Sequence, residues 1–238
     1  MIKRLSDILL SAVVLVMASP ALALAMLLIW RHDGHSPLHW GVRVGREGRE
    51  FRMVKLRSMR IDAERLGGAS TARSDTRITP LGRTLRRWKL DELPQFWNVL
   101  VGEMSVVGPR PNVRCGGVAD YTGEEMRLLS VRPGITDLSS IVFSDEADIL
   151  DGAADPDALY QAVIRPWKSR LGLLYVERRG LFADTAIIAL TAVAIVARPL
   201  ALEGVDLILT AWGANDQLRR ICRRRAPLPH GGPPGRTA

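Results

Sequence analysis

Two adjacent carboxylates, Asp91 and Glu92, are the residues in this sequence best suited to chemistry. Neighbours on a helix point about 100° apart, so this pair cannot flank one bond as the two carboxylates of a glycosidase do. The two side chains therefore serve different roles or none. An ionised aspartate at a helix start can act as a nucleophile, because carboxylates form acyl-phosphate intermediates, with a base or metal-orienting group beside it. The alternative from spacing alone is helix capping with surface salt bridges.

Arginines upstream of the pair are placed to hold a phosphate against Asp91. Arg83, Arg86 and Arg87 occupy one face of the helix that Thr79-Pro80 opens, at positions i, i+3 and i+4. A phosphate group suits arginine because the guanidinium binds it in a bidentate manner.

The carboxylate pair lies at a boundary between two helices. Pro94 disfavours helix at the residue before it and fits the first turn of a new helix, which we expect over residues 95–101, ending at Gly102. The Gly- and Pro-rich segment 106–111 predicts a rigid loop that presents Arg110. The sequence contains no P-loop, and His32 and His35 lack the partner set of a metal site.

An uncharged run of 23 residues, Ile8 to Trp30, is long enough to cross a hydrocarbon core of about 30 Å. Three interpretations compete: a signal peptide, a spanning helix, and a re-entrant helix that breaks at Ser19-Pro20 and returns to the same face. Cations flank both ends of the run, which is compatible with both ends being cytoplasmic.

The remaining elements are predicted from composition and periodicity. Residues 41–59 indicate a β-hairpin or strand-like segment, residues 62–75 a mobile loop, and residues 159–176 a helix. Residues 185–197 form a second uncharged run, too short to span a membrane, which predicts either a core helix or an interfacial one.

Charge is unevenly distributed along the 238 residues, whose net charge is +8. Residues 41–114 contain 16 basic and 8 acidic side chains, residues 115–216 contain 8 and 15, and residues 217–238 contain 6 and none. A positive balance favours a polyanionic partner: nucleic acid, a membrane surface or a phosphorylated substrate. The basic, Pro- and Gly-rich tail is predicted to be disordered and suits anionic lipid. Two distant cysteines, Cys115 and Cys222, support neither a disulfide framework nor a zinc module.

Taken together, these segments resemble the bacterial sugar transferases of the monotopic phosphoglycosyl transferase family. The resemblance runs from about residue 2 to about residue 198 and is most specific between Leu90 and Pro111. It rests on Lys3-Arg4-x-x-Asp7, Ser19-Pro20, Arg43-Val-Gly45, Phe51-x-x-x-Lys55-x-Arg57-Ser-Met59, Thr79-Pro-x-Gly-Arg83-x-x-Arg86-Arg87, Leu90-Asp-Glu-Leu-Pro-Gln95, Asn98-Val-Leu-x-Gly-Glu-Met-Ser105, Val107-Gly-Pro-Arg-Pro111 and Arg132-Pro-Gly-Ile-Thr136.

The resemblance implies transfer of a sugar-1-phosphate from a nucleotide diphosphate sugar to a polyprenyl (undecaprenyl) phosphate, with release of a nucleoside monophosphate. Asp91 would be the nucleophile that forms a covalent phosphosugar intermediate and helps to bind the required Mg²⁺, with Glu92 as its partner. The re-entrant break would fall on Ser19 and Pro20. The candidates for phosphate contact, from spacing and from the family motifs, are Lys55, Arg57, Arg83, Arg86, Arg87, Arg110 and Arg132.

One departure lies in the hairpin. Where many members read Phe-x-Gln-x-Arg-Val-Gly, this chain has Trp40 and Gly41 before Arg43, so a glutamine contact there is missing.

We therefore expect a mainly α protein with a small β-hairpin (α+β), in which a broken re-entrant membrane helix (1–31) precedes a cytoplasmic domain with interfacial helices (32–203). A C-terminal helix and tail (204–238) follow. The resemblance implies location at the bacterial inner membrane with the catalytic domain on its cytoplasmic face, where the protein would initiate exopolysaccharide, capsule, O-antigen or glycoprotein glycan assembly. Inner-membrane anionic lipids are expected partners and nucleic acid is not. The alternative is a membrane-anchored basic protein that binds anionic lipid or nucleic acid without catalysis.

Overall fold

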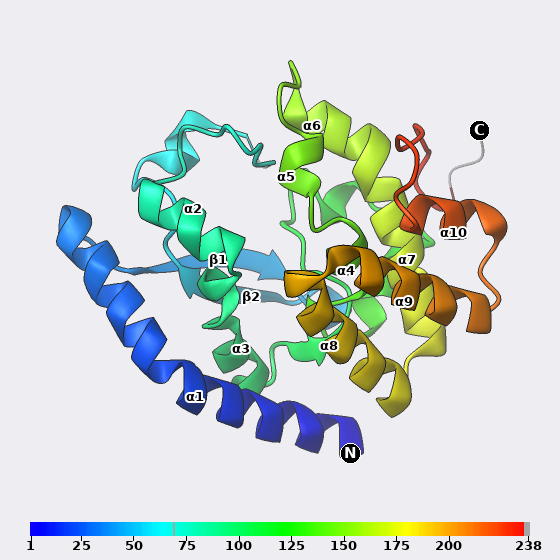
Figure 1. Ribbon diagram of the computed structural model, residues 1–238, viewed down its shortest axis with the longest axis horizontal. Helices are drawn as coiled ribbons and strands as arrows, with labels where there is room; N and C mark the ends of the chain where they lie inside the picture. Colours follow the sequence, from blue (N-terminus) through cyan, green and yellow to red (C-terminus); the bar gives the residue numbers. More distant parts are fainter. Residues whose placement is uncertain (69, 236–238) are drawn as a thin grey trace.

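The first 33 residues form one long helix that runs along the outside of the domain (Figure 1). The computed structural model describes residues 1–68 and 70–235. Within them, the helices are α1 (Ile2–Asp33), α2 (Pro80–Arg87), α3 (Gln95–Val101), α4 (Leu138–Val142), α5 (Glu146–Ile149), α6 (Pro156–Leu159), α7 (Arg165–Arg178), α8 (Leu181–Val196), α9 (Arg198–Ala211) and α10 (Asp216–Cys222). The strands are β1 (Leu38–Val44), β2 (Glu50–Leu56), β3 (Ser105–Val107) and β4 (Gly134–Thr136). The predicted class, mainly α with a small hairpin, is confirmed.

The re-entrant interpretation, which the family resemblance also implies, places a break at Ser19-Pro20, but α1 continues through both residues. Pro20 has no backbone N–H to donate to the carbonyl of Val16, four residues earlier. The Ser19 hydroxyl donates to that carbonyl instead, at 2.8 Å. Because the carbonyl is satisfied, the helix bends midway along its length rather than stopping (Figure 1).

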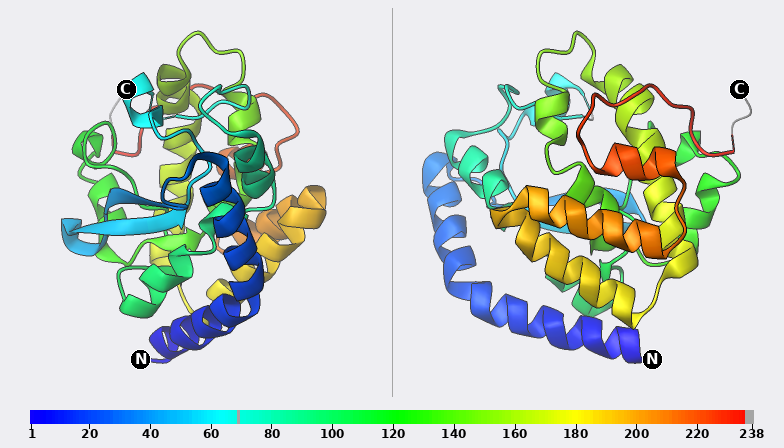
Figure 2. Two further views of the ribbon diagram at one scale, coloured as in Figure 1. Left: turned by 90° about the vertical axis from the view of Figure 1, so that its left-hand side faces the viewer. Right: turned by 45° about the vertical axis from the view of Figure 1, so that its right-hand side comes forward.

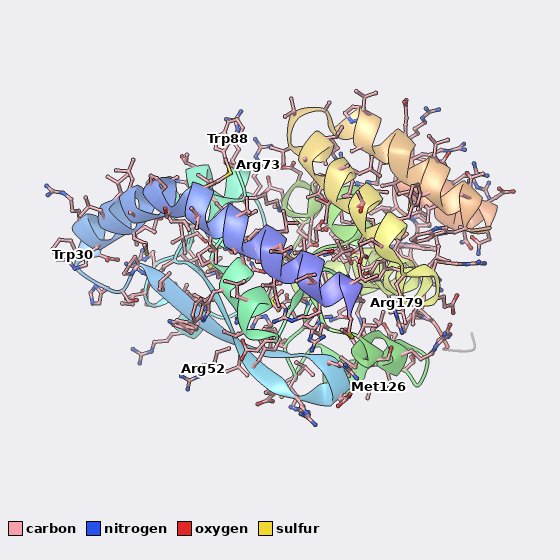
Figure 3. All side chains as sticks on the ribbon, turned by 90° about the horizontal axis from the view of Figure 1, so that it is seen from below. Trp30, Arg52, Arg73, Trp88, Met126 and Arg179 are labelled. Carbon is pink, nitrogen blue, oxygen red and sulfur yellow. The ribbon has the colours of Figure 1, made fainter. Side chains whose placement is uncertain are left out.

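Among the described residues, α1 is the one helix long and apolar enough to cross a membrane, by length and composition. Few of its side chains are buried in the domain, and large apolar ones such as Val16 and Met17 are exposed. Figure 3, which views the molecule from below, shows α1 lying across this side of the domain, with Trp30 near one end. An apolar helix with so little protein around it is suited to a membrane environment.

The N-terminal turn of α1 is fixed to the domain by polar side chains. Lys3 forms an ion pair with Asp184 of α8 at 2.6 Å, and the guanidinium of Arg4 donates to the Leu100 carbonyl at the end of α3 at 2.8 Å. The buried carboxylate of Asp7 accepts hydrogen bonds from the Ser105 hydroxyl (2.8 Å) and the Val106 amide (3.0 Å). These contacts give a structural role to the Lys3-Arg4-x-x-Asp7 segment.

The predicted hairpin is present: β1 and β2 pair antiparallel, with Gly41 opposite Met53 and His39 opposite Lys55. Asn98 of α3 joins the helix to this hairpin. Its side-chain oxygen accepts from the Val54 amide at 3.0 Å. Its side-chain nitrogen donates to the Arg52 carbonyl at 2.8 Å, so Asn98 ties α3 to the backbone edge of β2.

A second, parallel pair of strands, β3 and β4, was not predicted, because strands of three residues carry too little periodicity to recognise. The backbone passes so closely here that a Cβ on Gly134 would lie 2.1 Å from the amide nitrogen of Gly108. Only glycine permits this approach. It locks the segment leading to Arg110 against the segment that follows Arg132.

The main core lies between the hairpin, α3, α4 and the C-terminal helices, with Val99, Leu171 and Leu209 fully buried at its centre. Helices α8 and α9 pack side by side against it (Figure 2). The uncharged run 185–197 lies within α8, apart from its last residue, which follows the helix. Ile187 is buried in the core, whereas Phe182 and Val196 at its two ends are 89% and 88% exposed. The buried side of α8 agrees with the core interpretation, and the interfacial interpretation stays a prediction for its exposed apolar side chains.

The tail differs from its predicted disorder over the residues that the structure describes. The Trp167 indole donates to the Pro229 carbonyl at 3.2 Å, and the Gly231 amide donates to the Ala162 carbonyl at 3.0 Å. These two bonds satisfy backbone groups of the tail with partners on the domain that are distant in the sequence. Composition alone does not reveal such partners. The expected boundary at residue 203 falls inside α9.

Candidate functional site

The carboxylate pair lies in a single 3₁₀ turn, Leu90–Glu92, between α2 and α3. Lys89, which precedes it, has a left-handed backbone with φ of 57°, a conformation that few non-glycine residues adopt. This residue ends α2 and reverses the chain so that Pro94 can start α3, as predicted. The pair is thus held at a rigid corner between two helices.

Asp91 is buried, with 6% of its surface exposed, and its Oδ1 atom has no hydrogen-bond partner. Burial raises the pKa of this carboxyl, and the neighbouring charge of Glu92 raises it further, while Lys55 and Arg86 oppose the change. A buried carboxylate oxygen without a partner costs free energy, and a role in binding or catalysis is one explanation for its presence. The Oδ1 of Asp91 could thus contact a ligand.

Glu92 differs from Asp91 because it has a dedicated partner. Its two oxygens face the Arg110 guanidinium in a bidentate pair, one contact being 3.3 Å. Burial alone would raise the pKa of Glu92, but Arg110 and Lys89 outweigh it and lower the pKa to about 2. Glu92 is thus ionised and held in place by Arg110. The pKa of Asp91 is raised and that of Glu92 is lowered, as expected of two carboxylates with different roles.

Lys55 approaches the pair from β2. Its burial lowers its pKa to about 8, with a further contribution from Arg110, whereas Glu92 and Asp91 raise it. Lys55 is on the strand face that alternation assigns to the core side, next to the turn that holds both carboxylates. A lysine with this pKa changes charge readily in the range where enzymes operate.

Arg86 is held beside Asp91 by a close approach of backbones. A Cβ on Gly82 would lie 1.9 Å from the Ser58 carbonyl oxygen, so glycine alone allows α2 to rest on this segment. The Arg86 Nε then donates to the Ser58 hydroxyl at 2.9 Å. Burial lowers the pKa of Arg86 and the charge of Asp91 opposes this, which places the two groups in each other's field.

The structure thus brings Lys55, Arg86 and Arg110 to the carboxylate pair, but not the other predicted phosphate contacts. Arg57 binds Asp33 at the end of α1, with one N–O distance of 2.6 Å. Arg132 donates to the Gly102 carbonyl at the far end of α3, at 2.8 Å. Arg83 lines an open cavity of about 480 Å³ with His32 and Arg60, and Arg87 stacks on Trp88.

Sequence reasoning missed three residues of the site. Lys89 lowers the pKa of both carboxyls, Ser58 orients Arg86, and Gln95 is 1% exposed with a side-chain nitrogen that lacks a partner. Lys89 could have been identified from the sequence, because it lies two residues before Asp91. The contribution of Ser58 could not be read from the sequence, because it depends on the packing of Gly82.

The chemistry of the site fits a magnesium ion. Mg²⁺ binds through one or two carboxylates together with water and substrate phosphates rather than in a cage of protein ligands. The Oδ1 of Asp91, which has no hydrogen-bond partner, could serve as such a ligand. Among the described residues, no group of three or more acidic, histidine or cysteine side chains is arranged to hold a metal ion.

Comparison with known proteins places the chain in a family. The sequence profile of the family described as "Bacterial sugar transferase" matches residues 1–198. A putative undecaprenyl-phosphate N-acetylgalactosaminyl 1-phosphate transferase of Bacillus subtilis (strain 168) is 43% identical over 110 residues, covering 46% of this chain and 62% of that protein. A UDP-glucose:undecaprenyl-phosphate glucose-1-phosphate transferase of Klebsiella pneumoniae is 34% identical over 183 residues, covering 72% and 37%.

The exopolysaccharide production protein ExoY of Rhizobium meliloti (strain 1021) is similar over nearly its whole length: 32% identity over 210 residues, which are 82% of this chain and 85% of that protein. The chain spans less than two thirds of the length of the Bacillus and Klebsiella relatives. The profile match and the similarity to ExoY, together with the buried carboxylate corner, show that this chain belongs to the bacterial sugar transferase family.

Proposed function

We propose that this protein transfers a sugar-1-phosphate from a nucleotide diphosphate sugar to a polyprenyl phosphate, with Asp91 as the nucleophile. The observation that carries the proposal is the buried Asp91 carboxylate, whose free Oδ1 lies in the field of Lys55 and Arg86. The names of relatives, which act on undecaprenyl phosphate and UDP-sugars, support the same substrate classes.

The proposed reaction has two steps, and in each step one bond to phosphorus forms and another breaks. First, a carboxylate oxygen of Asp91 bonds to the phosphorus next to the sugar, and the bond from that phosphorus to the oxygen bridging the two phosphates breaks. The bridging electrons leave with the nucleoside monophosphate. Second, a phosphate oxygen of the polyprenyl phosphate bonds to the same phosphorus, and the acyl-phosphate bond breaks to restore Asp91. The product is a polyprenyl diphosphate sugar.

The surrounding residues bind and orient the reactants. Lys55 and Arg86 neutralise the phosphate under attack, and desolvation of Asp91 removes the water that would otherwise shield the nucleophile. Arg110 holds Glu92 so that this second carboxylate stays ionised beside Asp91 and does not take its place. A magnesium ion bound by Asp91 and the donor phosphates would supply further charge neutralisation there.

The exposed apolar surface of α1 supports a placement in the membrane. We infer that α1 enters the inner membrane from the cytoplasmic face and, because of its bend, returns to it, so that both Lys3 and Arg31 lie on that side. The apolar ends of α8 then contact the same interface. This position lets the lipid-borne phosphate of the acceptor reach Asp91, and the product would initiate a surface glycan such as an exopolysaccharide.

The alternative, a basic membrane-anchored protein that binds nucleic acid or lipid without catalysis, explains the net charge. It gives no role to the buried Asp91 carboxylate or to Lys55 and Arg86 beside it. A mobility shift with generic DNA at increasing salt separates the two: the transferase should show only weak retention that salt removes.

The decisive assay incubates the purified chain with undecaprenyl phosphate, Mg²⁺ and a panel of radiolabelled UDP-sugars. We expect a lipid-linked product with at least one donor, lost in Asp91→Asn. With donor labelled in the phosphate next to the sugar and no acceptor, label should remain on the wild-type protein and be released by hydroxylamine, which cleaves acyl phosphates.

Asp120→Asn, at an exposed position, is the matched control and should retain both signals. An Asp91→Asn variant that is folded and still forms lipid-linked product would refute the assignment of the nucleophile. Opposite-side labelling of cysteines placed at Ile2 and His35, in a chain with Cys115 and Cys222 replaced, would refute the re-entrant placement of α1.

A further inference from the structure

The face of the hairpin that carries Lys55 also carries His39 and Arg43. His39 is the partner of Lys55 in the antiparallel register, so the two side chains project from the same face at adjacent positions. Positions 39, 41 and 43 alternate with 40 and 42, so His39, Gly41 and Arg43 share this face and Trp40 belongs to the opposite one. The imidazole thus lies beside Lys55 on the same face of the hairpin.

Gly41 creates the space in which His39 and Arg43 meet. A Cβ on Gly41 would lie 3.1 Å from an Arg43 guanidinium nitrogen and 3.5 Å from the His39 Nε2. Both side chains therefore fold over the bare backbone of this residue. A side chain at this position would occupy the space that these two groups share.

Lys55 connects the His39 and Arg43 pair with the carboxylate corner. Arg110, Glu92, Arg43 and Asp91 all act electrostatically on Lys55. The strand register sets His39 directly beside Lys55. A diphosphate whose first phosphate contacts Lys55 at the carboxylate turn could therefore place its second phosphate at His39 and Arg43.

We propose that His39 and Arg43 bind the donor phosphate that leaves with the nucleoside. This inference rests on the function proposed above. When the bridging bond breaks, negative charge accumulates on the leaving phosphate, and donors positioned there stabilise that charge. Arg43 contributes a permanent cation, and His39 contributes a group whose donor capacity depends on its protonation.

Binding of UMP, the product expected from a UDP-sugar, tests this without requiring catalysis. Affinity is measured by calorimetry on the full-length protein in detergent with Mg²⁺. We expect His39→Ala to weaken UMP binding about tenfold, the usual effect of losing a charge-assisted hydrogen bond. Gly41→Val, which fills the shared space with an apolar side chain, should weaken it to a similar extent. Trp40→Ala, on the opposite face, is the matched control and should bind UMP as wild type does.

Equal UMP affinities in wild type and folded His39→Ala would overturn the role of His39 while leaving the transferase proposal intact. Unchanged affinity in folded Gly41→Val would overturn the shared-space argument. Failure of the wild-type protein to bind UMP, with no lipid-linked product from any donor, would overturn both proposals.

Discussion

Replacing Arg110 with glutamine should destabilise the protein far more than replacing an exposed arginine that also forms an ion pair with a glutamate. The lowering of the Glu92 pKa from 4.5 to about 2 corresponds to about 3 kcal/mol of favourable interaction for the ionised carboxylate. Glu92 is 15% exposed and Arg110 is 35% exposed, so water screens part of this energy. We therefore expect Arg110→Gln to cost about 2–3 kcal/mol, mostly from leaving Glu92 buried without a counter-charge.

The measurement is the thermal unfolding midpoint of the purified protein in detergent. For a chain of this size the cost should lower the midpoint by roughly 5–10 °C. Arg114→Gln is the matched control, because Arg114 pairs with Glu50 at 2.6 Å while both side chains are about half exposed. That change should cost at most about 1 kcal/mol. The double variant Glu92→Gln/Arg110→Gln should be more stable than Arg110→Gln alone, since no unpaired charge remains.

The destabilisation caused by Arg110→Gln should also change with pH in a predicted direction. Glu92 has a lower pKa in the folded protein than in the unfolded chain, so the pair contributes fully above about pH 4.5 and its contribution is lost as the pH falls toward 2. The difference between wild type and Arg110→Gln should therefore shrink as the pH is lowered through 4.5. Equal midpoints for Arg110→Gln and Arg114→Gln at neutral pH would refute the view that Arg110 holds a buried carboxylate.

Three further predictions concern other elements. Transferase activity should fall as the pH rises through about 8 because Lys55 loses its proton; Lys55→Arg should move this fall to higher pH, and an unmoved profile would assign it to another group. Asp7→Ala should destabilise the protein by about 1–3 kcal/mol, because the Val106 amide loses its acceptor, whereas Ser6→Ala should be neutral in the same thermal assay. Pro20→Ala should straighten α1, so that the distance between spin labels at residues 6 and 30 increases toward about 36 Å; a wild-type distance already at that value would contradict the bend.

Local chemistry explains which elements were predictable. Pro94 and Gly102 bound α3 as expected, because proline and glycine constrain the chain through their own backbones. The hairpin followed from alternation. The continuity of α1 did not, since the compensating bond from Ser19 to the Val16 carbonyl is a side-chain detail that a proline alone does not reveal. The ordered tail depends on acceptors such as the Ala162 carbonyl, which lie far away in the sequence.

For the site, the sequence by itself determined the adjacent carboxylates, their position between two helices and the supply of nearby cations, because these depend on residue type and short spacing. The tertiary structure decided which cations reach the pair. Arg110 arrives through the close contact of Gly108 with Gly134, and Arg86 through the contact of Gly82 with Ser58, whereas Arg57 and Arg132 are committed elsewhere. The pKa values of Asp91 and Glu92 shift in opposite directions because Arg110 pairs with Glu92, in a site from which distant segments exclude water when they pack together.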